Sequence, residues 1–177
     1  EGDKVVQEMN KVIPILEDYL EKEDEPSKNV YTILAQLYLQ AEEPEQAIQL
    51  TEQAIDDLSN RPTYFRLYGT QGINYTGTIN EGGSSRSVKG TTPKRIQVSS
   101  SEGMVSGSFQ KTEGGRRQAK GRLRVGLYLE GTEVASGRTT SIGDTVSISQ
   151  DLSSVAPLAE LQNYRLNALN QIGDTER

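Results

Sequence analysis

The 177-residue sequence contains neither cysteine nor histidine. Their absence excludes disulfides, thiolate nucleophiles, zinc sites of the Cys/His type, and the side chain that most often acts as a general base near neutral pH. The chain also has no apolar run near the roughly 18 residues that a membrane-spanning helix needs. Only 33% of its residues are hydrophobic and the mean hydropathy is -0.62. We therefore expect modest hydrophobic cores.

Charged residues are distributed unevenly along the chain. Residues 1–62 contain fifteen acidic and five basic residues, a net charge of -10, whereas residues 63–150 contain six acidic and twelve basic residues, a net charge of +6. Residues 151–177 add -2. This opposition has two interpretations: the two halves dock on each other, or the basic half faces an anionic partner such as a membrane surface or an acidic protein.

Apolar residues recur at steps of three and four over residues 3–23, 28–40 and 44–58, which predicts amphipathic helices. Pro14 lies inside the first of these segments and predicts a kink or a break. Pro44 fits the first turn of the third, where a missing N–H costs nothing. The predicted inner face of the second helix consists of Tyr31, Leu34, Ala35 and Tyr38.

The side-chain period changes from helical to extended after Pro62. The clearest alternation is residues 122–129, followed by a Glu130-Gly131 turn and a returning segment at residues 132–136, which together predict a β-hairpin. Residues 80–87 are rich in Gly and Ser and are interpreted as a mobile loop. The inward residues of the strand at residues 122–129 are predicted to be Leu123, Val125, Leu127 and Leu129. Further short strands are predicted at residues 64–68, 73–79, 94–98, 104–110 and 145–149.

Several short strands bounded by turn residues are typical of an antiparallel sandwich. Residues 154–172 return to helical spacing with Ser154 as a cap, and a strand over residues 164–169 is the alternative. This last helix is expected to pack on the N-terminal helices or on one sheet. The predicted fold class is α+β: a helical domain at residues 1–62, an antiparallel β-sandwich at residues 63–150, and a C-terminal helix and tail at residues 151–177.

Residues 28–62 resemble a tetratricopeptide repeat. The residues that carry the resemblance are Tyr31, Leu34, Ala35 and Tyr38, then Ala47 and Ala54, with Pro62 after them. Thr51 stands where the family usually has a large apolar residue. The first predicted helix is similar to the second half of a preceding repeat, at a spacing of about 35 residues. Because such arrays usually need about three repeats to form a peptide groove, a fragment of a longer array and a packing module are both open.

A second resemblance lies in Asn74-Tyr75-Thr76, Thr92-Pro93, residues 126–135 and residues 143–147. Through these segments, residues 64–150 are similar, over about 80 residues, to the MmpS family of small membrane-associated actinobacterial proteins, whose outer part is a β-sandwich. The resemblance implies an extracytoplasmic accessory domain without catalysis. The family's anchor and its cysteines are not in this sequence, so transport of a particular lipid is not implied.

No arrangement of residues predicts catalysis, a metal site or a cofactor. The acidic residues at 42–45 and 56–57 fall at helix ends and on polar faces, where surface charge explains them better than acid/base work. The Gly-rich segments lack the lysine and hydroxyl ending of a phosphate-binding loop and are interpreted as hairpin turns.

The densest basic cluster has five cations within nine residues. The cluster is interpreted as a solvated loop plus the outer face of a strand, with a site that holds phosphates or anionic headgroups as the alternative. No aromatic residue interleaves with these bases, so no nucleic-acid partner is expected. The tyrosines of the sandwich, Tyr64, Tyr68, Tyr75 and Tyr128, either fill its core or form an exposed patch. The candidate partner-binding residues are Tyr31 and Tyr38 in the helical domain and Arg116, Arg117, Lys120, Arg122 and Arg124 in the basic cluster.

The sequence as a whole favours a non-enzymatic interaction or scaffold module of a bacterial cell-envelope assembly, with protein partners held by the helical groove and by a sandwich surface. The alternative is a carrier or sensor that binds an apolar or anionic small ligand in or beside the sandwich. Glu1 is not a methionine and no signal-like segment follows it, which we interpret as either a trimmed chain or a processed product. The expected location is extracytoplasmic, with a cytoplasmic location as the alternative.

Overall fold

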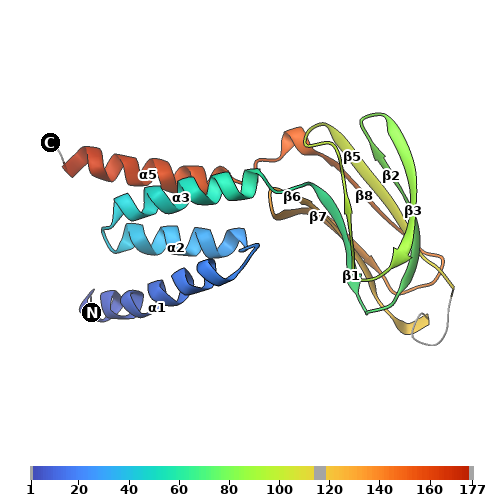
Figure 1. Cartoon of the computed structure of the whole chain (residues 1–177), viewed down its shortest axis with the longest axis horizontal. Helices are drawn as coiled ribbons and strands as arrows, with labels where there is room; N and C mark the ends of the chain where they lie inside the picture. The colour runs from blue at the N-terminus through green and yellow to red at the C-terminus, as the bar shows by residue number, and fades with distance from the viewer. Residues whose placement is uncertain (1, 114–118, 176–177) are drawn as a thin grey trace. The chain divides into compact units, whose positions relative to one another are not determined.

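A computed structural model of the chain describes residues 2–113 and 119–175, with the side chains of residues 2–7, 10, 174 and 175 excepted. It confirms the α+β class: helices come first and last along the chain, and the strands between them in sequence form a two-sheet β-sandwich (Figure 1). The chain divides into two compact units: residues 1–60 with residues 158–177 form a helical unit, and residues 61–157 form a sandwich unit. The C-terminal helix therefore belongs to the same unit as the N-terminal helices.

The helical unit contains α1 (Gly2–Lys22), α2 (Lys28–Gln40), α3 (Pro44–Ser59) and α5 (Ala159–Thr175). α5 packs against α3 and α2, so the tail is a helix and not a strand over residues 164–169. It begins later than predicted, because Ser154 belongs to a short 3-10 turn, η1 (Leu152–Ser154), and the helix starts only after Pro157. α1 continues through Pro14, which excludes a break at that proline.

The core of the helical unit is built where small side chains let helices approach. Ala35, Ala47, Ala54 and Ala168 are all fully buried, together with Leu34, Leu58 and Leu161. Thr51 is also fully buried, and its hydroxyl donates to the Ala47 carbonyl at 2.8 Å. A threonine fits this core position because its polar atom is satisfied inside its own helix.

The sandwich unit consists, in its described residues, of two four-stranded antiparallel sheets. Sheet A has the order β4-β1-β6-β7 and sheet B the order β3-β2-β5-β8. The strands of sheet A are β4 (Lys94–Gln97), β1 (Tyr64–Gly69), β6 (Leu123–Leu129) and β7 (Thr132–Thr139). Those of sheet B are β3 (Ser84–Thr91), β2 (Asn74–Glu81), β5 (Met104–Lys111) and β8 (Thr145–Asp151).

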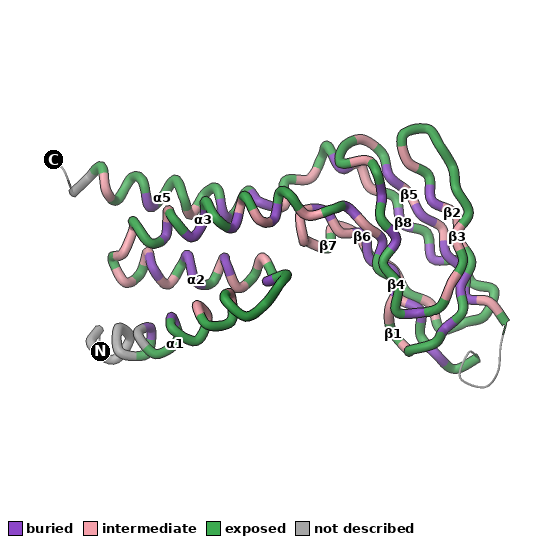
Figure 2. The backbone as a smooth tube through the Cα atoms, viewed as in Figure 1, coloured by how far each residue is buried: buried purple, intermediate pink, exposed green. Residues whose placement is uncertain are grey.

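The core of the sandwich unit lies between the two sheets, where buried and exposed residues alternate along the strands (Figure 2). Phe65 of β1 meets Phe109 of β5 edge to face, with ring centroids 5.2 Å apart. Such pairs join the two sheets through their largest side chains. The predicted inward residues of β6 are all buried: Leu123, Val125, Leu127 and Leu129.

The predicted central hairpin is confirmed: β6 and β7 pair through a turn in which Glu130 and Gly131 both have positive φ. The predicted mobile loop at residues 80–87 is wrong. Gly82 and Gly83, with φ of 55° and 78°, form a two-residue hairpin turn that joins β2 to β3. β3 is an edge strand with mostly exposed residues, so it lacks the apolar alternation by which strands are recognised.

Candidate functional site

The outer face of sheet A carries aromatic and cationic residues in alternation with the core. On β1, Tyr64, Arg66 and Tyr68 point outward between buried Phe65 and Leu67. Antiparallel pairing places Tyr64 opposite Tyr128, Arg66 opposite Gly126, and Tyr68 opposite Arg124. We define the Arg/Tyr face by the outward residues Tyr64, Arg66, Tyr68, Arg95, Arg124, Tyr128 and Glu133.

Stacking orders the side chains of the Arg/Tyr face. The rings of Tyr64 and Tyr128 are parallel within 5° and 5.0 Å apart, and the Arg95 guanidinium lies 4.9 Å from the Tyr64 ring centre. Over Tyr68 lie two guanidiniums, Arg66 at 5.2 Å and Arg124 at 5.0 Å. A guanidinium over an aromatic ring can still donate N–H bonds from its edge, so Arg66 and Arg124 combine stacking with the capacity to bind an anion.

Glu133 contributes a carboxylate to this face and is held by two tyrosines. The hydroxyls of Tyr68 and Tyr128 donate to its Oε2 atom at 3.0 and 2.9 Å. Desolvation raises the pKa of Glu133, but the hydrogen bonds and the nearby Arg124 outweigh it, so the pKa is lowered. Burial, together with the bond to Glu133, raises the pKa of Tyr68, and raises that of Tyr128 to about 12. Both tyrosines are therefore neutral donors at physiological pH.

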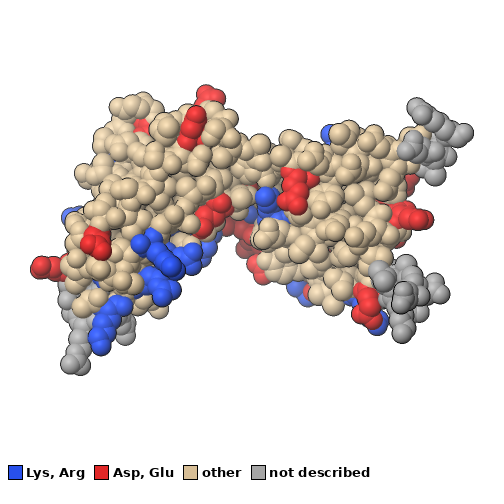
Figure 3. Space-filling view, turned by 180° about the vertical axis from the view of Figure 1, so that it is seen from behind, with Lys and Arg blue, Asp and Glu red and all other residues tan. Residues whose placement is uncertain are grey.

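One end of the Arg/Tyr face is hollowed. We call this hollow, of about 850 Å³, the basic hollow. Among the described residues that line it, four are cationic and none is acidic. Figure 3 shows Lys and Arg side chains gathered over one part of the sandwich unit. The lining consists of Arg66, Tyr68, Gly69, Thr70, Gln71, Pro93, Lys120, Arg122, Arg124 and Thr140.

The rim of the basic hollow is fixed by close backbone contacts between β1 and the entrance of β6. Thr70 and Arg122 exchange two hydrogen bonds: the Thr70 N–H donates to the Arg122 carbonyl and the Arg122 N–H to the Thr70 hydroxyl, both at 3.0 Å. Gly69, with φ of 118°, permits this approach, because a Cβ there would lie 2.4 Å from the Arg122 carbonyl oxygen. The backbone that carries Arg122 is thus held in one place.

A buried lysine anchors the other side of the hollow. Lys111, at the end of β5, is fully buried, and its Nζ atom donates to the carbonyls of Gly121 at 2.7 Å and Ala119 at 3.2 Å. It also donates to the Thr140 carbonyl. These carbonyls flank Lys120 and Thr140, which line the hollow. Three acceptors satisfy the three donors of an ammonium group, so Lys111 is a structural cation that positions the segment carrying Lys120.

The structure brings three of the predicted partner-binding residues, Lys120, Arg122 and Arg124, to the basic hollow. Arg116 and Arg117 lie outside the described residues. Arg66 was not among the predicted residues, and Tyr68 was expected only in the core or in an aromatic patch, because both come from a strand more than fifty positions earlier. Sequence reasoning also found no aromatic residue among the bases, whereas pairing of β1 with β6 places Tyr68 beside Arg124. The alternation of residues 64–68 was the one sequence signal that Arg66 and Tyr68 share the outer face of a strand.

Of the sandwich tyrosines, Tyr75 is buried in the core and meets Phe109 edge to face. Tyr64, Tyr68 and Tyr128 instead lie half-buried on the outer face of sheet A, which agrees with the patch predicted as the alternative to a core position. They are outward because they share strand faces with Arg66 and Arg124. Their hydroxyls therefore reach Glu133 or solvent and not the core.

The helical unit has a groove of about 660 Å³ to which α1, α2 and α3 all contribute. We call it the helical groove. The predicted residue Tyr38 lines it, and its hydroxyl donates to a Glu17 carboxylate oxygen. Burial and Glu17 together raise the pKa of Tyr38. The predicted residue Tyr31 is buried, with its hydroxyl 3.2 Å from Asp57. The groove is lined by Glu17, Leu20 and Glu21 of α1, Leu34 and Tyr38 of α2, and Gln46, Gln49, Leu50 and Gln53 of α3.

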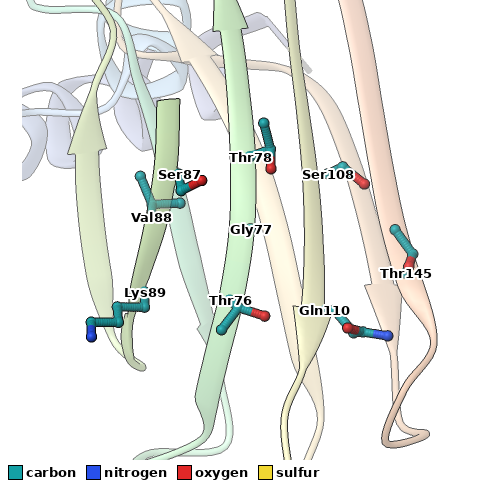
Figure 4. Close-up of a pocket in the computed structure, with 9 residues that line it drawn as sticks. All are labelled: Thr76, Gly77, Thr78, Ser87, Val88, Lys89, Ser108, Gln110 and Thr145. Carbon is teal, nitrogen blue, oxygen red and sulfur yellow. The ribbon is translucent and has the colours of Figure 1, made fainter. Parts of the chain in front are cut away.

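The outer face of sheet B is also hollowed, by about 630 Å³, but its lining is different in kind. Figure 4 shows hydroxyl and amide side chains standing on β2, β3, β5 and β8, with Lys89 at one edge. No aromatic or acidic residue is among the described residues that line this hollow, and Lys89 is the one cation there.

In the part of the chain that the structure describes, no group of three or more carboxylates is placed to hold a metal ion. No described helix is long and apolar enough to cross a membrane. Comparison with protein-family models finds no match, and comparison with curated proteins finds no relative.

Proposed function

We propose that the chain is a non-enzymatic protein-interaction module whose helical unit, tetratricopeptide-like, holds a peptide segment of a protein partner in the helical groove. The observation that carries this proposal is the groove itself. Its base is apolar, since Leu34 and Leu50 are buried there, and its volume falls in the range of ligand sites.

The lining of the helical groove defines the chemistry of the partner segment. Gln46, Gln49 and Gln53 extend from α3 at steps of three and four, so their amides stand on one helix face and can bond to a peptide backbone. Glu17 and Glu21 add negative charge from α1. Charge complementarity therefore favours a segment that presents a Lys or Arg next to an apolar side chain.

Selection from a displayed peptide library on the full chain tests this function. The selected peptides are expected to be basic and apolar, and to lose roughly tenfold or more in affinity for the variants Gln49→Arg and Gln53→Arg, which place like charge and bulk in the groove. Gln162→Arg on the exposed face of α5 is the matched control and should leave binding unchanged.

Recovery of no binding peptide would contradict the proposal. Binding that Gln162→Arg weakens as strongly as the groove variants would also contradict it, since the site would then lie elsewhere. A role in a bacterial cell-envelope assembly stays a prediction that rests on the resemblance of residues 64–150 alone.

A second function, binding of an anionic small ligand beside the sandwich, is favoured by a separate observation. Four cations converge on the basic hollow without an acidic residue among its described lining. Like charges gathered at one place repel one another, and a bound anion removes that repulsion. Binding of an apolar small ligand between the sheets has less support, because core side chains fill that space.

A further inference from the structure

We propose that the basic hollow is a phosphate site, which takes a ligand that carries a phosphate monoester or a diphosphate. This inference rests on the second proposed function, anion binding beside the sandwich, and is independent of the helical groove. It names the class of anion and the residues that select it. Lys120, Arg122, Arg124 and Arg66 supply the charge, and Thr70 and Thr140 add hydroxyl groups.

The number of cations favours phosphate over a carboxylate. A carboxylate carries one charge, whereas a phosphate monoester carries about -1.5 to -2 at neutral pH and presents three acceptor oxygens. Four cations around one hollow of about 850 Å³ match a compact ligand with several charges. Several separate carboxylate side chains would have to enter the same space to balance them.

The arginines present the geometry that phosphate recognition uses. The guanidinium carbons of Arg66 and Arg124 lie 5.2 and 5.0 Å from the centre of the Tyr68 ring, and a guanidinium over a ring can still form paired N–H bonds from its edge to two oxygens. Stacking lowers the entropy that these side chains would lose on binding. The tyrosine thus acts through the arginines and is a positioning residue.

The same stacking disfavours single-stranded nucleic acid. Binding of bases without sequence preference uses exposed ring faces on which the bases stack. In this face the rings of Tyr64 and Tyr68 are already covered by Tyr128, Arg95, Arg66 and Arg124. What the Arg/Tyr face offers a ligand is therefore guanidinium edges and not bare aromatic surface.

The hollow is built before a ligand arrives. Lys111 holds the carbonyls on both sides of Lys120, and the paired hydrogen bonds of Thr70 hold Arg122. The Thr70 hydroxyl accepts from the Arg122 N–H, which leaves its own hydrogen available, and its side chain lines the hollow. Little reorganisation is needed on binding.

Titration of the full chain with inorganic pyrophosphate, followed by calorimetry and by amide NMR shifts, tests the proposal. Citrate is the matched anion, since it has a similar charge near neutral pH but only carboxylates. Pyrophosphate is expected to bind about tenfold or more tightly than citrate, because its oxygens fit the guanidinium forks. The shifts are expected at residues 69–71, 120–124 and 140.

Substitutions identify the site. Lys120→Gln and Arg124→Gln are each expected to weaken pyrophosphate binding about tenfold, the effect of losing one charged hydrogen-bond donor. Arg124→Lys keeps the charge but loses the planar fork and should weaken binding by a smaller factor. Lys89→Gln on the outer face of sheet B removes the same charge from a side chain that does not line the basic hollow, and should leave affinity unchanged. Unaltered amide spectra outside the hollow show that each variant is folded.

Two further probes distinguish the source of the phosphate. Vesicles of phosphatidylcholine with phosphatidic acid test a lipid headgroup, and pyrophosphate tests a soluble ligand; binding of either that Lys120→Gln weakens supports the proposal. A single-stranded oligonucleotide bound more tightly than pyrophosphate would replace it with a nucleic-acid site.

The remaining outcomes distinguish failure of the phosphate site from failure of the anion-binding function on which it rests. Equal affinity for citrate and pyrophosphate overturns the phosphate inference and leaves the anion-binding function intact. Absence of binding by every anion overturns both. Pyrophosphate binding that Lys120→Gln and Arg124→Gln do not weaken overturns the assignment to this hollow.

Discussion

The outer faces of sheet A and sheet B follow the same alternation, in which every second side chain enters a shared core, yet they differ in chemistry. Sheet A presents stacked tyrosines and arginines around a basic hollow. Sheet B presents Ser, Thr and Gln around a neutral one, with Lys89 at its edge. Both hollows are of similar size, so what separates them is the groups that line them.

The difference shows which strand positions of a β-sandwich can vary in residue type without loss of the core. Inward positions must be apolar, since they fill the core between the sheets. Outward positions need only be compatible with a strand, and Ser or Thr on a hydrated face requires no further explanation. Arginines stacked on tyrosines are a different case, because repulsion among the arginines opposes folding. Glu133 lies near Arg124 and offsets part of this repulsion, but the four cations of the basic hollow have no acidic residue among its described lining. Sheet A is therefore the face whose composition a bound anion would help to explain.

The largest expected effect comes from the buried cation that supports sheet A's hollow. Lys111→Met removes the amine from three carbonyls, and we expect a loss of about 3 kcal/mol in the free energy of unfolding because these buried acceptors are left without a donor. Urea unfolding measures it. Lys89→Met on sheet B is the control, with a change within about 0.5 kcal/mol. Equal effects of the two substitutions would show that Lys111 has no anchoring role.

The next effect compares a core-facing glycine of sheet B with an outward-facing glycine of sheet A. A Cβ on Gly107 would lie 2.5 Å from the Phe109 ring and 2.9 Å from Phe65, inside the core. Gly107→Ala should therefore cost about 2 kcal/mol through overpacking. A Cβ on Gly126 would meet the ends of Glu133 and Tyr128 on the outer face, which can move into solvent, so Gly126→Ala should cost less than about 1 kcal/mol. The reverse order in thermal unfolding would contradict the assignment of inner and outer faces.

A smaller effect concerns the aromatic stack itself. Tyr128→Leu keeps apolar bulk but removes the stack on Tyr64 and the bond to Glu133, so we expect a loss of about 1 kcal/mol. Ser108→Ala on sheet B removes a hydroxyl whose bond to Ser147 is long, at 3.4 Å, and should change stability by less than about 0.5 kcal/mol. Chemical denaturation of both variants shows whether the stack contributes more than the neutral face.

The smallest expected effect is a pH dependence. The folded pKa of Glu133 is lowered from 4.5, so its contribution is fully present above that value and is lost as the pH falls through the folded pKa. Because the carboxylate is largely solvated, the contribution should be below about 1 kcal/mol. Glu133→Gln should therefore flatten the fall in stability below pH 4.5, measured by thermal unfolding at stepped pH. If the stability of Glu133→Gln falls at acid pH as steeply as that of the unsubstituted chain, Tyr68 and Tyr128 do not stabilise the ionised form of Glu133.

Much of the fold follows from side-chain period. Leu123, Val125 and Leu127 occupy alternate positions, and burial of all three confirms the strand. The second helix was predicted with the bounds that it has. β3 could not be found in this way, because an edge strand of Ser, Arg and Lys has no apolar face to reveal it. Its only local signal was the Gly82-Gly83 pair, which indicates a hairpin as well as a loop.

Only the residues of the candidate site that are neighbours in sequence could be predicted. Lys120, Arg122 and Arg124 are neighbours in sequence, and a charge count finds them. Arg66 and Tyr68 join them only through the register between β1 and β6, which a single sequence does not specify. Lys111 could not be distinguished from a surface lysine, because its burial depends on carbonyls contributed by residues 119, 121 and 140.

The insertion of the sandwich unit between α3 and α5 fixes the order in which the protein can be completed during synthesis. Residues 61–157 are all made before the helix that closes the helical unit, and domains generally fold as units while the chain emerges. Until Leu161 and Ala168 arrive to cover α3, the first three helices have an uncovered apolar side. The sandwich unit can therefore fold before the helical unit is complete. The contact between α3 and α5, which completes the helical unit, joins segments about a hundred residues apart in the chain.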